Sequence, residues 1–158
     1  LSAGGPPLIL HDEAAATVGS LRTFNAMDAE AYVAFRASVE RLASVIGGTF
    51  DSPPPDIDSP SASDLWSLLK TGRRFRSLGQ RDSYRLLRWL PRPVSDLLTE
   101  WFADERLRAV LAGPAFSGTM LGPRSAGSSL VMLLREACRQ RAGGRSIRAP
   151  RVARREEA

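Results

Sequence analysis

The chain has 158 residues, of which 43% are hydrophobic and 25% charged, a balance typical of one globular domain with its own core. It contains no run of about 18 uncharged apolar residues, so no transmembrane helix is predicted. The first residues carry no basic segment typical of a secretory signal, and we expect a cytoplasmic protein. The lone cysteine (Cys138) and the lone histidine (His11) exclude a disulfide framework and a Cys/His zinc site.

The formal net charge of +5 is concentrated at the C-terminal end. Residues 1–134 hold 14 basic and 14 acidic side chains, whereas residues 135–158 hold eight arginines and three glutamates. The body of the chain is therefore neutral, and a nucleic-acid-binding body is not favoured. Residues 143–158 have no apolar periodicity and are predicted to form a disordered basic tail.

The N-terminal part predicts one strand followed by two helices. Leu8-Ile9-Leu10 follows two prolines and suits a short buried strand, which makes residues 1–11 part of an incomplete sheet. A modest helix is expected from Asp12 to Phe24. A stronger helix should begin after Asn25 as N-cap and end at Gly47-Gly48. Its apolar stripe recurs at steps of three and four at Ala31, Phe35, Val39, Leu42 and Ile46.

The middle of the chain alternates predicted helices with breakers. Residues 49–60 hold four prolines and read as an exposed connector. Ser61 should start a helix whose third residue is Asp64 and whose apolar face is Leu65, Trp66, Leu68 and Leu69. Further helices are predicted over residues 80–90, 94–102 and 104–112, the last ending at Gly113-Pro114.

A glycine- and serine-rich loop over residues 117–129 separates those helices from a last one, which should begin near Leu130 and run to about residue 142. The predicted fold class is mainly α, with a helical segment over residues 12–142 and one short strand near the N-terminus.

The 117–129 loop resembles a phosphate-binding loop only in its glycines. Gly122 and Gly127 have the spacing of a P-loop, but no lysine follows them, and the only lysine is Lys70. No Gly-x-Gly-x-x-Gly occurs anywhere. Ser125 does not stand in a Gly-x-Ser-x-Gly elbow. We therefore predict no catalytic, cofactor-binding or metal-binding residue, and expect a substrate-side loop with Gly118, Met120, Gly122, Ser125 and Gly127.

Residues 70–92 hold eight basic side chains against one acid, Asp82, interleaved with aromatic and aliphatic residues. Such a segment can lie on an anionic membrane, with Arg74, Phe75, Arg85 and Trp89 facing the lipid. It can also bind nucleic acid, which we favour less, or its arginines can pair with acids on neighbouring helices. The large aromatic side chains Trp66, Trp89, Trp101 and Phe102 are expected mainly in the core, with one exception that the sequence does not identify.

Several short segments occur in an order that resembles a known family. They are Asn25-Ala26-Met27 followed by DAEAY (28–32), then DLW (64–66), LLKTGRRFRSLG (68–79), RDSYRLLRWLP (81–91), DLLTEWF (96–102) and GTMLGPRSAGS (118–128). In this order they look like the middle of phytoene-dehydrogenase-like FAD-dependent oxidoreductases, a group that includes the pyridine nucleotide-disulfide oxidoreductase domain-containing proteins. The resemblance spans residues 8–135, and the residues after Leu134 depart from it.

The resemblance implies a substrate-domain segment of an α+β flavoenzyme. In that family the two ends of a chain about three times longer hold FAD, and the middle supplies a helical cap over the flavin. The implied chemistry is dehydrogenation of an apolar small-molecule substrate by hydride transfer to the flavin. This chain would then be a fragment that retains no FAD, is inactive alone, and self-associates through apolar faces that normally meet the rest of the enzyme.

Two other classes of function stay open at this stage. One is a small helical binding module that uses residues 70–92 and the basic tail on anionic membranes or nucleic acid. The other is a helical protein–protein interaction domain without chemistry. The sequence alone does not separate them from the cap segment.

Overall fold

The computed structural model describes residue 10 and residues 14–50 and 61–143. Within this part it contains seven α-helices and no strand, so the mainly-α prediction is confirmed. The helices are α1 (Ala14–Arg22), α2 (Ala26–Thr49), α3 (Ala62–Ser77), α4 (Gly79–Trp89), α5 (Val94–Trp101), α6 (Glu105–Phe116) and α7 (Ser128–Arg141).

Four predictions fall wholly or partly outside the described residues, including the first two residues of the helix predicted from Asp12 to Phe24. Leu8 and Ile9 of the predicted strand lie outside, and Leu10 is irregular and packs against the core. Most of the predicted connector lies outside as well, although Thr49 ends α2 and Phe50 caps it. Of the predicted basic tail, only Gly143 is described.

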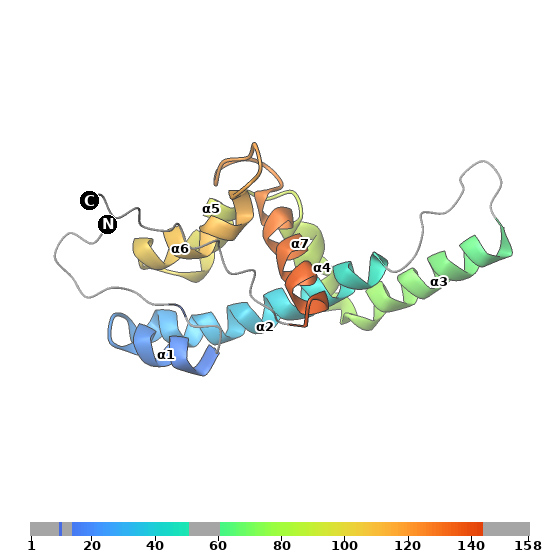
Figure 1. Cartoon of the computed structure of the whole chain (residues 1–158). Helices are drawn as coiled ribbons and strands as arrows, with labels where there is room; N and C mark the ends of the chain where they lie inside the picture. Colours follow the sequence, from blue (N-terminus) through green and yellow to red (C-terminus); the bar gives the residue numbers. More distant parts are fainter. Residues whose placement is uncertain (1–9, 11–13, 51–60, 144–158) are drawn as a thin grey trace, which may run out of the picture.

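Helix α2 is the longest helix, with 24 residues, and the other helices lie along it (Figure 1). Asn25 caps it as predicted, because its side chain accepts hydrogen bonds from the backbone N–H groups of Met27 and Asp28. Its most extensive contacts are with α7 and α1. The helix continues through Gly47-Gly48 to Thr49, one residue beyond the predicted stop. The partly exposed Gly48 carbonyl accepts a hydrogen bond from Arg74, and the buried Gly47 lies against Ala137 of α7.

The aromatic part of the core lies where α2 meets α4, α5 and the residue that follows α5 (Phe102). The ring of Phe35 is 5.8 Å from that of Trp89, 5.5 Å from that of Trp101 and 5.2 Å from that of Phe102, measured between centroids. Trp89 and Phe102 are buried, as predicted for the large aromatics. Edge-to-face packing of this kind adds to the stabilisation that comes from burying the area alone.

Helix α3 projects away from this core (Figure 1). Ser61 and Asp64 form the predicted capping box: the Ser61 N–H donates to the Asp64 carboxylate (2.9 Å), and the Asp64 N–H donates to the Ser61 hydroxyl (3.2 Å). No residue of α3 is buried, and four of its five large apolar side chains, Leu65, Trp66 (69% exposed), Leu68 and Leu69, face solvent, whereas Phe75 is half-buried against the core. Trp66 is therefore the exception among the large aromatics.

Two helix boundaries near the C-terminal half differ from the prediction. Helix α6 does not end at Gly113-Pro114 but continues to Phe116. Proline removes one backbone donor, yet the last turn still closes because the Ser117 N–H donates to the Gly113 carbonyl at 3.1 Å. Helix α7 begins at Ser128, two residues before the predicted start.

Candidate substrate groove

A groove of about 300 Å³ lies between α2, α6 and α7, and each helix contributes one face. Its volume is at the lower end of ordinary ligand pockets. It is lined by Leu10, by Tyr32, Phe35, Arg36 and Val39 of α2, by Val110, Leu111 and Pro114 of α6, and by Met132, Arg135, Glu136 and Arg139 of α7.

The floor of the groove is apolar and shared with the core. Phe35, Val39 and Met132 are buried, and the hydroxyl-bearing ring of Tyr32 is buried beside them. Val110 on the α6 wall remains about half exposed. A small apolar molecule placed here would exchange water for contact with these side chains, which is the main source of affinity for apolar ligands.

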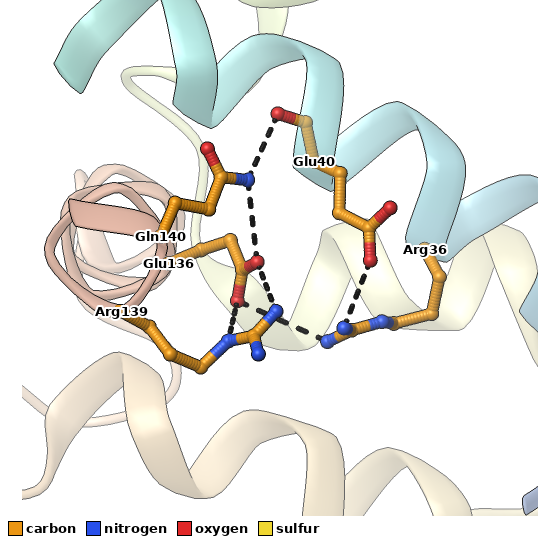
Figure 2. Close-up of polar contacts among 5 residues, drawn as sticks. All are labelled: Arg36, Glu40, Glu136, Arg139 and Gln140. Atoms are coloured by element: carbon orange, nitrogen blue, oxygen red, sulfur yellow. Dashed lines mark hydrogen bonds and ion pairs between the residues drawn. The ribbon is translucent and has the colours of Figure 1, made fainter. Parts of the chain in front are cut away.

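One side of the groove carries a polar cluster that joins α2 to α7, and Figure 2 shows its side chains. The Glu136 carboxylate accepts two hydrogen bonds from the guanidinium of Arg139, at 2.8 and 2.5 Å. It also lies 3.9 Å from the Arg36 guanidinium, which donates to Glu40 at 2.9 Å. Gln140 donates from one amide nitrogen to both Glu136 and the Glu40 backbone carbonyl.

Glu136 is buried, and its ionisation depends on this cluster. Burial raises the pKa of its carboxyl, but the hydrogen bonds and charge of Arg139, with the charge of Arg36, outweigh that effect and bring the pKa below the usual 4.5. Glu136 is therefore ionised at neutral pH and acts as the acceptor that positions both arginines beside the groove.

The predicted substrate-side loop lies outside the lining of this groove. Its backbone is tied to the α4–α5 connection: Ser95 N–H donates to the Pro123 carbonyl, Gly127 N–H to the Pro91 carbonyl and Ser129 N–H to the Arg92 carbonyl, at 3.0–3.2 Å. We call this set of bonds between residues 91–95 and 123–129 the clasp. Ser128 completes it, because its hydroxyl accepts a 2.8 Å bond from the Val94 N–H.

Each of the five predicted loop residues has a definite place. Gly118 and Gly127 adopt positive φ angles, and Met120 is fully exposed. Ser125 accepts a hydrogen bond from the Gly122 N–H at 3.0 Å and so closes a local turn. Their assignment as a substrate-side loop remains a prediction. The loop contacts one residue that lines the groove, Arg135, whose guanidinium donates to the Ser117 carbonyl beside Gly118.

The first backbone N–H groups of α7 are not available to hold a phosphate. Those of Ser128, Ser129 and Leu130 donate to the carbonyls of Ser125, Arg92 and Gly127. A helix N-terminus binds anions only through N–H groups that lack such partners. The start of α7, where the spacing of Gly122 and Gly127 resembles a phosphate-binding loop, therefore does not fit the pyrophosphate of FAD.

Half of the eight basic side chains of residues 70–92, namely Arg74, Arg85, Arg88 and Arg92, bond to other groups of the described structure. Arg85 and Arg41 both reach Asp82, at 2.9 and 3.0 Å, and Arg88 and Arg92 both reach Glu100, at 2.8 and 2.6 Å. Of the four residues predicted to face a membrane, Trp89 is buried, Phe75 is half-buried against the core, and Arg74 and Arg85 make the internal hydrogen bonds described here. Within residues 70–92 the exposed large apolar side chains are instead Tyr84 and Leu87 of α4, and α3 exposes Leu65, Trp66, Leu68 and Leu69 before that segment.

The sequence did not identify the groove residues as a site. Arg36, Arg135, Glu136 and Arg139 are ordinary charged residues of amphipathic helices, and only the packing of α2 on α7 brings them together. A weak signal was available, because Met132, Arg135, Glu136 and Arg139 follow helical spacing and share one face. Within residues 10, 14–50 and 61–143 there is no group of three or more potential metal ligands and no helix that could cross a membrane.

The relatives found by comparison with known proteins include two mammalian proteins, each named pyridine nucleotide-disulfide oxidoreductase domain-containing protein 2. The chain is 31% identical to the protein from Rattus norvegicus over 140 residues and 30% identical to that from Mus musculus over 136 residues. These matches cover 81% and 80% of the chain but 23% of each relative. No family model and no solved structure matches it significantly. The chain is thus distantly homologous to one segment of these proteins and spans about a quarter of their length.

Proposed function

We propose that this chain is the substrate-binding helical segment of a flavin-dependent oxidoreductase related to phytoene dehydrogenase. The observation that carries the proposal is the similarity to one segment, and not the whole, of oxidoreductase-domain proteins. The order of motifs over residues 8–135 supports the same family. The whole enzyme's activity and apolar substrate are part of this proposal.

The groove between α2, α6 and α7 is the proposed substrate site. Its apolar floor would bind and orient the substrate and exclude water from it. The start of α7, where the glycine spacing resembles a phosphate-binding loop, does not fit the pyrophosphate of FAD, so in this proposal the flavin is held by segments that these residues do not include. In this proposal the chain binds the substrate and carries out no redox chemistry by itself.

A flavin titration tests this division. We expect the purified chain to show no flavin absorbance and no saturable binding of added FAD. In the reading frame of the encoding gene, we expect a Gly-x-Gly-x-x-Gly after a predicted strand upstream of these residues. Stoichiometric FAD on this chain, or flanking sequence unrelated to any flavin-binding segment, would contradict the proposal.

A second candidate function is binding to an anionic membrane surface, and the exposure of α3 favours it. Trp66 and Leu69 line the same open depression as Lys70 and Arg73, so apolar and basic side chains share one side of the helix. Helices with this combination lie in the headgroup region of anionic bilayers. This combination supports α3, rather than the paired arginines of α4, as the proposed membrane contact.

Vesicle sedimentation tests this second candidate. The chain should bind vesicles that contain phosphatidylserine and release them at high salt, and Trp66→Ser should weaken binding several-fold without lowering thermal stability, since Trp66 is exposed. Val33→Ser is the matched control, because Val33 is an exposed apolar residue on α2. Equal loss in both variants, or binding to uncharged phosphatidylcholine alone, would argue against a site on α3.

A further inference from the structure

The charged residues of the groove are unbalanced. Its lining includes three arginines, Arg36, Arg135 and Arg139, and one carboxylate, that of Glu136. Two of the arginines already face that carboxylate, since Arg139 bonds to it through two nitrogens and Arg36 lies 3.9 Å away. One cationic side chain of the groove is therefore left without an acidic partner in the described part of the chain.

That side chain is Arg135. Its guanidinium donates to the Ser117 backbone carbonyl, a neutral acceptor, at the point where the end of α6 approaches α7. It is exposed, so it can accept a ligand group that stays partly in contact with water. A guanidinium has five N–H donors, and one carbonyl leaves most of them available for a second acceptor.

A cationic ligand is disfavoured by the same arrangement of side chains. Both oxygens of Glu136 accept hydrogen bonds, from Arg139 and from Gln140, and the carboxylate is buried. A cationic ligand would have to displace these donors and would meet three arginines. An uncharged hydrocarbon would fill the floor but gain nothing from Arg135.

We infer that the groove between α2, α6 and α7 binds an amphipathic anion, an apolar chain or ring that carries one carboxylate, with its apolar part on Phe35, Val39 and Met132 and its carboxylate on Arg135. This inference rests on the proposed role of the groove as a substrate site and adds the chemical class of the substrate. A groove of about 300 Å³ limits the enclosed part to a small apolar group.

Calorimetric titration with two probes that share an alkyl chain tests the inference on the full chain without flavin. Octanoate carries the carboxylate, and octan-1-ol has the same chain without charge. We expect octanoate to bind about fivefold more tightly than octan-1-ol, the size of effect typical of a partly exposed ion pair, and we expect the difference to shrink in high salt.

Three variants locate the effect. Arg135→Gln should bring octanoate affinity down to that of octan-1-ol and leave octan-1-ol unchanged. Val110→Glu places a charge on the half-exposed apolar wall and should weaken both probes. Arg124→Gln is the matched control, because it removes an exposed arginine outside the groove, and it should change neither affinity.

The outcomes distinguish a failure of the groove as a substrate site from a failure of Arg135 as the carboxylate contact. If neither probe binds, the groove is not a ligand site, and the proposed function loses its substrate site. If both probes bind the unaltered protein equally, the groove is a site but the anion inference is wrong, and this comparison needs no variant to fold. If octanoate is preferred but Arg135→Gln has no effect, the carboxylate is not on Arg135 and the inference fails in its central residue.

Discussion

Two neighbouring serines at the start of α7 differ in their hydrogen bonds although both are fully buried. The Ser128 hydroxyl accepts a bond from the Val94 N–H at 2.8 Å and donates to the Ser125 carbonyl at 2.8 Å. The Ser129 hydroxyl has no hydrogen-bond partner in the described structure. Because a buried polar group is costly when unpaired, the two side chains affect stability in opposite directions.

We therefore predict opposite effects of removing each hydroxyl. Ser128→Ala leaves a buried backbone N–H without an acceptor and should lower the free energy of unfolding by about 1–3 kcal/mol. Ser129→Ala removes a hydroxyl that lacks a partner and should leave the free energy of unfolding unchanged or slightly raised. Urea unfolding of both variants measures the difference, and equal losses would show that the Ser128 bonds do not hold the clasp.

At the scale of elements, the contact between α2 and α7 depends on charges as well as packing. Glu136 of α7 accepts from Arg139 of its own helix and faces Arg36 of α2, while Gln140 reaches the α2 backbone (Figure 2). The folded-state pKa of Glu136 lies below the usual 4.5. Its contribution to stability is therefore fully present above pH 4.5 and is lost as the pH falls through the lowered folded-state value.

Glu136→Gln tests this contribution. The variant should be less stable than the unaltered protein at pH 7, because Arg139 and Arg36 lose their ionised acceptor. The difference should shrink once the pH falls well below 4.5, where Glu136 itself becomes protonated. Thermal unfolding at several pH values gives the comparison. Glu30→Gln, at an exposed position of α2, is the control. A difference that does not depend on pH would mean that shape and not charge is responsible.

The elements that could be predicted are those whose signals are local. Asn25, Ser61 and Asp104 cap their helices with their own side chains, so a few neighbouring residues predicted each start. The end of α6 was misplaced because Pro114 acts locally as a breaker, whereas the bond from Ser117 to Gly113 continues the turn. The groove was not predicted because it depends on how α2, α6 and α7 pack, which periodicity does not encode.

At the scale of the whole molecule, one core contains buried residues of six helices, whereas α3 buries none and packs against that core through the half-buried Phe75. Periodicity predicted the apolar face of α3 correctly as a face, but not that nothing within the described residues covers it. Leu65, Trp66, Leu68 and Leu69 together form an exposed apolar surface of the kind that marks interaction sites.

Self-association through α3 is the corresponding prediction. Sedimentation velocity should show larger species as the concentration rises, and the double variant Leu65→Ser, Leu69→Ser should shift the population toward monomer. Val33→Ser with Leu87→Ser removes two exposed apolar side chains from other helices and should have a smaller effect. A chain that remains monomeric at every concentration would remove α3 from consideration as a self-association surface.

The clasp has a consequence for how this architecture tolerates change in its sequence. Because residues 91–95 and 123–129 are hydrogen-bonded to each other, the part of the chain that holds α5 and α6 begins and ends at one place, while both helices bury residues in the core. Segments whose two ends lie side by side accept insertions and deletions with little disturbance elsewhere. Homologues can therefore lengthen, shorten or replace the stretch between α6 and the clasp, where Met120 already stands in solvent, while α2, α4 and α7 keep their places.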